Sequence, residues 1–224
     1  MSKKAAKKQD QFENVEQVLS ASEAFIEKYQ KEILYGLGVI AVLVMAFLAV
    51  NSYVVKPRIA VAAHEMYKAQ QYFAKDSFML ALQGDDFESI GFEAISSKYS
   101  LTTSGNLAKA YAGICYYNLG EYEEAIRCLS AYDGNDNYFT PSVTGLIGDC
   151  YVELGESSKA IRYFSKAASS GNEVIAPIFL KKTAVVLEST GETNKALKNY
   201  LELKEKYPLS QEAQDIDKYI ARLQ

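Results

Sequence analysis

Three stretches of this chain align without a gap: AGICYYNLGEYEEAIRCL at residues 112–129, IGDCYVELGESSKAIRYF at 147–164 and TAVVLESTGETNKALKNY at 183–200. The second copy begins 35 residues after the first, and the third begins 36 residues after the second. A period between about 20 and 50 residues indicates repeat units that bury their apolar faces by stacking on their neighbours. The sequence therefore predicts a repeat architecture across these residues.

Small residues recur at three places in each copy: at a close contact in a first helix, at a turn, and at the crossing in a second helix. By copy they are Gly113, Gly120 and Ala125; Gly148, Gly155 and Ala160; and Ala184, Gly191 and Ala196. Larger apolar residues stand where two such helices would interdigitate, namely Tyr116, Tyr151, Leu187, Leu129, Phe164 and Tyr200. The copies resemble tetratricopeptide repeats, which are helix-turn-helix units of about 34 residues. The resemblance implies an all-α solenoid.

Capping residues and flanking segments extend this interpretation in both directions. We expect Pro141 and Pro177 at the first position of their helices and Asn106 as the cap of the first repeat. Upstream, residues 58–82 and 86–99 predict a degenerate helix pair, and the spacing of Asp85 and Glu88 between and within them is that of a capping box.

Downstream, Ser210 is expected to open a last helix that caps the array and carries Ile216, Tyr219, Ile220 and Leu223 on one face. Residues 56–224 then form three to four helix pairs with a capping helix.

An uninterrupted apolar run extends from Ile33 to Val50. Its 18 residues span roughly 27 Å as a helix, and continuation to residue 55 gives roughly 34 Å, enough for a bilayer core of about 30 Å. Tyr35 and Tyr53 stand near the two ends, where amphipathic rings favour the interface. We predict a membrane span over 33–55, with a helix buried in a soluble core as the alternative. A cleavable signal is disfavoured by the 32 residues that precede the run.

Residues 1–32 form the short flank of this span. They carry six lysines and six acidic residues, so the formal net charge of −4 resides in the remainder of the chain. Lysines on a short flank, opposite a domain that crosses regardless of charge, predict a cytoplasmic N-terminus. Apolar residues at helical spacing in this flank predict an amphipathic helix: Phe12, Val15, Leu19, Ile26 and Tyr29. An acidic outer domain disfavours nucleic-acid binding, which requires a concentrated cationic face.

Residues with catalytic or metal-binding chemistry are sparse. The single histidine, His64, has no nucleophile motif beside it, and Cys115, Cys128 and Cys150 fit no zinc spacing. Helix packing is the favoured role of these thiols, and a bridge between Cys115 and Cys128 is the alternative in an oxidising compartment. The loop at residues 133–137 imitates the start of a calcium loop but lacks its glycine and its bidentate glutamate, so it is interpreted as an inter-repeat turn. We predict no catalytic residue, no metal and no cofactor.

The predicted function is therefore a surface for proteins. In tetratricopeptide arrays the first helix of each pair lines a groove, and in this register the groove would expose Tyr117, Asn118, Asp149, Glu153, Lys181 and Glu188. The alternative is that these side chains are only solvated. Acidic C-terminal peptides are not the expected ligand, because Ala110 and Ile114 occupy positions where family members that bind them use lysine and asparagine.

The order of segments, together with the stretch QVLSASEAFIEKYQKEILYGLGVIAVLV at residues 17–44, is similar to the YfgM-type family of single-span bacterial inner-membrane proteins. The resemblance implies a non-catalytic subunit ancillary to the Sec translocon, with its repeats in the periplasm. The implied partners are SecYEG-type translocon subunits, a membrane-anchored periplasmic chaperone or prolyl isomerase, and nascent polypeptides. A general cell-envelope assembly scaffold and an outer-mitochondrial import receptor are the alternatives; crosslinking in cells distinguishes the first, and topology distinguishes the second.

Overall fold

The computed structural model describes residues 28–85 and 89–224, and the chain divides into two units between Lys56 and Pro57. Over the described residues the secondary structure is helical, and the one extended pairing there is an isolated bridge between Gly84 and Ile90. The predicted all-α class is confirmed.

The first unit contains an apolar helix. Residues 28–50 are helical and lead into a π-helical segment, η1 (Asn51–Val55). The 46-residue helical stretch Lys28–Phe73 is the one part of the described chain that is long and apolar enough to cross a membrane. All side chains from residue 28 to 50 are exposed. The expected stripe from Phe12 to Ile26 lies outside the described residues.

The second unit begins with three helices, α2 (Lys56–Phe73), α3 (Phe78–Gln83) and α4 (Phe92–Lys98). The expectation of one helix over 58–82 is wrong, because the chain turns after Phe73. In this turn Asp76 has a φ of 55°, and the Ser77 backbone N donates to the Tyr72 carbonyl at 3.0 Å. The helix therefore divides where a short polar stretch, residues 74–77, lets its two halves pack on the same core.

An aromatic cluster joins these helices to the first repeat. The ring of Phe73 packs edge-on against Phe78 and Tyr111, with centroids 5.6 and 5.1 Å apart, and Phe92 stacks on Tyr111 at 5.0 Å. Phe92 has no exposed surface. Aromatic pairs at these separations bury large apolar areas and prefer such edge and offset geometries.

Asp85 closes the loop between α3 and α4. Its carboxylate accepts hydrogen bonds from the Tyr72 hydroxyl at 2.5 Å and from the Ser89 backbone N at 3.0 Å. Glu88, the expected partner of Asp85 in a capping box, lies outside the described residues. The side chain of Asp85 thus ties the loop to α2.

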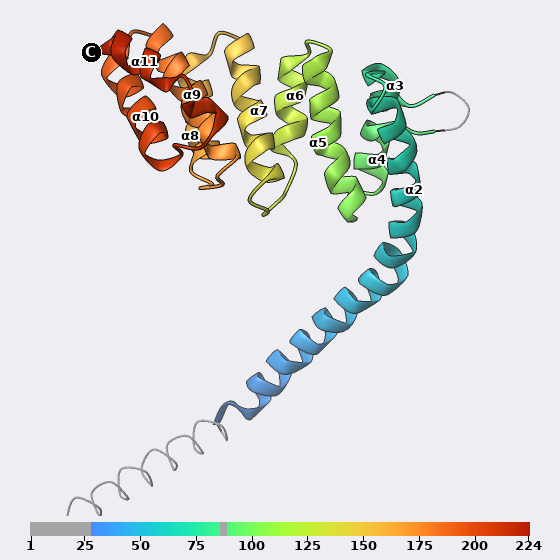
Figure 1. The fold of residues 1–224 in the computed structure, drawn as a ribbon. Helices are drawn as coiled ribbons and strands as arrows, with labels where there is room; N and C mark the ends of the chain where they lie inside the picture. Colours follow the sequence, from blue (N-terminus) through green and yellow to red (C-terminus); the bar gives the residue numbers. More distant parts are fainter. Residues whose placement is uncertain (1–27, 86–88) are drawn as a thin grey trace, which may run out of the picture. The chain divides into compact units, whose positions relative to one another are not determined.

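Three antiparallel helix pairs follow and stand side by side in Figure 1. They are α5 (Thr103–Asn118) with α6 (Tyr122–Ser130), α7 (Phe139–Glu153) with α8 (Ser157–Ala168), and α9 (Ile175–Ser189) with α10 (Thr193–Lys206). The predicted glycine turns are confirmed, since Gly120, Gly155 and Gly191 have φ values of 80°, 72° and 81°. Other residues adopt this left-handed conformation only at a cost in free energy.

The small residues of the first helices permit the close approach that the repeat predicts. A β-carbon on Gly113 would lie 2.5 Å from Leu129 Cγ, and one on Gly148 would lie 2.6 Å from the ring of Phe164. Ala160 in the second helix has no exposed surface. The first two repeats therefore depend on the absence of a side chain at this position and on a large side chain opposite it, and Ala184 occupies the equivalent position in the third.

The helix caps differ from expectation. Thr102, rather than Asn106, caps α5, with its hydroxyl accepting from the Gly105 backbone N at 3.0 Å. Asn106 lies inside α5 and binds the inter-repeat loop, donating to the Asp133 carbonyl at 2.6 Å and accepting from the Asp133 backbone N at 3.1 Å.

The prolines also sit two positions later than predicted. Asp136 Oδ1 accepts from the Tyr138 backbone N at 2.9 Å, and Asn172 Oδ1 accepts from the Ile175 backbone N at 3.0 Å. These side chains start α7 and α9 early, so Pro141 and Pro177 become third residues. The first-turn positions still suit proline, because backbone N–H groups there have no partner within the helix.

The array ends in a 3₁₀ turn, η2 (Gln211–Ala213), and a last helix, α11 (Ile216–Leu223). Ile216 and Ile220 are buried in one apolar cluster with residues of α9 and α10, and Tyr219 and Leu223 pack on it. The predicted capping role is therefore confirmed for these side chains. The expected start of the helix at Ser210 is wrong, because Ser210 precedes η2 and α11 begins only at Ile216.

Candidate protein-interaction groove

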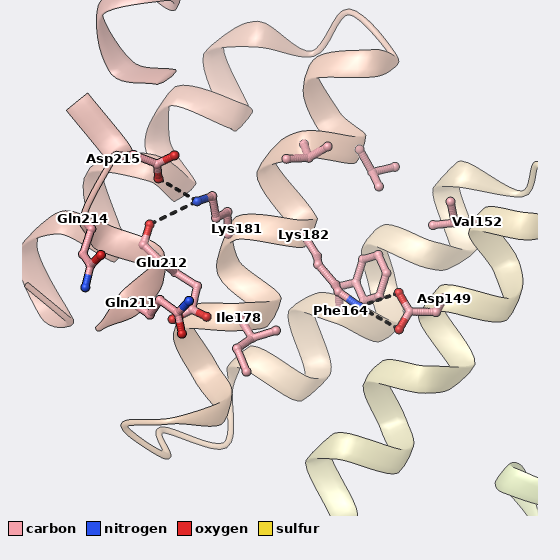
Figure 2. A pocket seen from close by; sticks show the side chains of 12 residues that line it. Asp149, Val152, Phe164, Ile178, Lys181, Lys182, Gln211, Glu212, Gln214 and Asp215 are labelled. Carbon is pink, nitrogen blue, oxygen red and sulfur yellow. Dashed lines mark hydrogen bonds and ion pairs between the residues drawn. The ribbon is translucent and has the colours of Figure 1, made fainter. Parts of the chain in front are cut away.

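A groove of about 740 Å³ lies on the last two repeats, and we call it the α9 groove. Helix α9 forms its floor, α7 and α8 form one wall, and the segment from η2 to Asp215 forms the other (Figure 2). The lining residues are Asp149, Val152, Phe164, Ile178, Lys181, Lys182, Val185, Val186, Gln211, Glu212, Gln214 and Asp215. Five of these side chains are apolar, five are charged and two are amides, so the groove offers both apolar and polar contacts.

Lys181 links the floor to the wall formed by the cap. Its Nζ lies 2.8 Å from Asp215 Oδ1 and 3.4 Å from the Glu212 carbonyl (Figure 2). The same Nζ stands 5.0 Å from the centre of the Tyr219 ring. The hydrogen bond from this ammonium holds the pKa of Asp215 below its ordinary value. The ion pair between Lys181 and Asp215 therefore holds the segment from η2 to Asp215 against α9.

Lys182 links the floor to the opposite wall. Its Nζ lies 2.7 Å from both carboxylate oxygens of Asp149 (Figure 2). The same Nζ is 5.6 Å from the centre of the Phe164 ring and 5.5 Å from that of Phe179. Burial raises the pKa of Asp149, and the hydrogen bond from Lys182 opposes that shift. Both lysines of the floor are thus already neutralised by carboxylates of the chain itself.

A second hollow of about 480 Å³ adjoins the first, and the two share Ile178, Gln211 and Glu212. Two strongly exposed apolar side chains line it, Val174 with 56% and Leu209 with 98% of its surface exposed. The two hollows together make one extended surface along α9.

Of the six residues predicted for the groove, the structure places two in the lining of the α9 groove and four elsewhere. Asp149 and Lys181 line the α9 groove. Tyr117 lies one repeat away and packs edge-on against Tyr122 at 5.8 Å; burial and the nearby Asp149 carboxylate raise its pKa.

The other three of the six lie outside the groove lining. Asn118 donates to the Ile114 carbonyl of its own helix at 2.8 Å, and Glu153 is exposed at the end of α7. Glu188 accepts from the Tyr200 hydroxyl at 3.2 Å and pairs with Arg222 at 2.7 Å, so it joins α9 to α10 and α11. A binding role for the six remains a prediction.

Sequence reasoning missed Ile178, Lys182 and Val185, although a signal was present. With Lys181 these residues follow the spacing i, i+3, i+4 and i+7, which is one face of a helix. No comparable signal identified Glu212, because it reaches the groove only through the turn after Pro208 and the packing of α11.

Over 28–85 and 89–224 no three histidine, cysteine or acidic side chains gather as a metal site. The three cysteines are free thiols, and burial raises the pKa of Cys115 and of Cys150 to about 12, which keeps both uncharged and unreactive. His64 is exposed on α2.

Comparison with known proteins agrees with the repeat geometry. The sequence profile of the Tetratricopeptide repeat family matches residues 182–210. The fold is that of a tetratricopeptide-repeat solenoid. Two crystal structures of nearly identical TPR-like repeats, from a Podosopora anserina protein described as a kinesin light chain, superpose with TM-scores of 0.54 and 0.50 at 11% and 10% identity. They cover 72% of this chain and 84% and 93% of their own.

A search of curated proteins returns no match to the sequence. Tetratricopeptide repeats present extended concave surfaces to other proteins, and the array is generally a non-enzymatic scaffold. The repeats of this chain therefore imply a role in protein–protein interaction.

Proposed function

We propose that this chain is a protein-interaction subunit anchored in the bacterial inner membrane by the helix over residues 33–55. Its repeats stand in the periplasm beside the Sec translocon and bind a companion chaperone or an emerging polypeptide. The α9 groove carries the proposal, because it is an open, largely apolar surface whose walls are fixed by ion pairs on both sides. Such a surface suits a segment of another protein better than a small, enclosed substrate.

The apolar helix supports the anchored arrangement. Its side chains over residues 33–50 are exposed, and in water this exposure would cost free energy that a lipid environment removes. The similarity of residues 17–44 to the YfgM-type family supports the translocon as the neighbouring machinery.

Site-specific photo-crosslinking in cells tests the proposed role. A photoreactive amino acid at Val185, in the groove, is compared with one at Leu201 on α10; the two side chains are equally exposed, at 46% and 44%. We expect translocon subunits, an anchored chaperone or nascent chains to be captured from Val185 and not from Leu201. Capture of outer-membrane assembly components alone would favour the envelope scaffold instead.

Topology is tested separately with Leu209→Cys, whose side chain is almost fully exposed. A membrane-impermeant maleimide is added to spheroplasts that carry the variant in a Cys128→Ser background, because Cys128 is half-exposed whereas Cys115 and Cys150 are buried. We expect labelling of the variant without lysis. Labelling only after lysis would place the repeats in the cytoplasm and contradict the proposal.

A further inference from the structure

Around the α9 groove the positively charged side chains have ion-pair partners, whereas two negatively charged ones have none in the described part of the chain. Every lysine that lines the two hollows has a carboxylate partner within the chain: Lys181 pairs with Asp215, Lys182 with Asp149 and Lys206 with Glu202. Among the described residues, none forms an ion pair with Glu212 or Glu173, which line the same surface. The surface therefore has negative charge available and no positive charge available.

Glu212 stands at the junction of the two hollows. It is half-buried and lines both of them, together with Ile178 and Gln211. Its backbone carbonyl accepts from Lys181, which fixes the segment, while its carboxylate stays available. On one side lie Val152 and Val185, and on the other Val174 and Leu209, all exposed apolar side chains.

We propose that the α9 groove binds a polypeptide segment in which apolar residues flank a single lysine or arginine, with the basic group on Glu212. The inference rests on the proposed interaction role and specifies its ligand. Apolar side chains of the segment occupy the two hollows. The half-buried Glu212 carboxylate between them attracts a cationic side chain of the segment and repels an anionic one. Acidic segments are disfavoured because Lys181 and Lys182 would have to leave existing partners to receive them.

Peptide binding to the full chain in phosphatidylcholine nanodiscs tests this ligand. The probe is a fluorescein-labelled peptide, Gly-Ser-Val-Leu-Lys-Leu-Val-Ser-Gly, and its counterpart carries glutamate in place of lysine; empty nanodiscs correct for lipid binding. We expect the lysine peptide to bind about tenfold more tightly, as for a partly desolvated charged hydrogen bond. Equal affinity for both peptides, or no binding of either, would overturn the inference.

Matched variants locate the effect. Glu212→Gln should remove the preference for lysine, whereas Glu123→Gln, an exposed carboxylate on α6, should preserve it. Val185→Asp should weaken the binding of both peptides, whereas Leu201→Asp should leave their binding unchanged. Circular dichroism melting shows that each variant is folded. A preference that survives in Glu212→Gln contradicts the assignment, as does a dimer of the free chain that this substitution dissociates, since the occupant would then be a second copy.

The peptide experiment can contradict the inferred ligand without contradicting the proposed function, and the reverse also holds. If crosslinks from Val185 to translocon proteins persist while the peptides show no charge preference, only the ligand class is wrong. If the preference is present and the crosslinks are absent, the groove has the inferred ligand but not the proposed cellular role.

Discussion

The repeat array and the helices that precede it are stabilised in different ways. From α5 to α10, a glycine or alanine faces a large side chain at the same place in each repeat, as with Gly148 and Phe164. From α2 to α4 there is no such period, and an aromatic cluster around Phe92 and a hydrogen-bonded Asp85 perform the same task. The comparison shows that a repeat specifies its own geometry locally, whereas the non-repetitive end depends on contacts between residues distant in sequence.

The largest expected effect follows from removing the centre of the aromatic cluster. Phe92→Ala should lower the free energy of unfolding by about 4 kcal/mol, because a fully buried ring is replaced by a cavity. Hydrogen exchange followed by mass spectrometry should show protection lost first in α2 to α4. Equal loss throughout α7 to α10 would show that the two regions unfold as one unit and would contradict the distinction.

A smaller effect is expected where a repeat is overfilled. Gly148→Ala should lower the free energy of unfolding by about 2 kcal/mol, because the added carbon would lie 2.6 Å from the Phe164 ring, which stacks on Phe179. Urea unfolding of the single variants and of Gly148→Ala combined with Phe164→Leu measures the coupling. We expect the double variant to lose less free energy of unfolding than the sum of the losses in the two single variants. Simple additivity would mean that these side chains do not compete for the same space.

These expectations also separate what the sequence could predict from what it could not. The period placed the glycine turns and the close contacts, because both are decided by residues within one repeat. The division of the expected 58–82 helix was missed, since Phe73 meets Phe92 and Tyr111 only in the folded protein. The cap side of the groove was missed for the same reason, because Glu212 is brought to α9 by the packing of the cap.

Removing the side chain of Asp85 tests the loop between α3 and α4. Asp85→Ala should cost about 1.5 kcal/mol, because the Tyr72 hydroxyl and the Ser89 backbone N lose a charged acceptor. Asp133→Ala is the matched control in the array, where Asn106 binds the backbone and not the side chain of residue 133. We expect Asp133→Ala to change the free energy of unfolding by less than about 0.5 kcal/mol. Similar costs for the two would show that Asp85 contributes no more than an ordinary loop residue.

The smallest effect concerns the cap of α7 and depends on pH. The Thr140 side chain and the backbone N–H groups of residues 138–140 hold the pKa of Asp136 at about 2, below its ordinary value of 3.8. A carboxylate with a depressed pKa stabilises the folded state above the ordinary value, and this contribution declines as pH falls from about 4 toward 2. Because the side chain is exposed, the capping contribution should be about 1 kcal/mol or less. Asp136→Asn retains the capping oxygen without titrating, so urea unfolding between pH 5 and pH 2 should show a shallower decline than in the wild type. Parallel curves would mean that the charge of Asp136 makes no contribution and that its oxygen alone starts the helix.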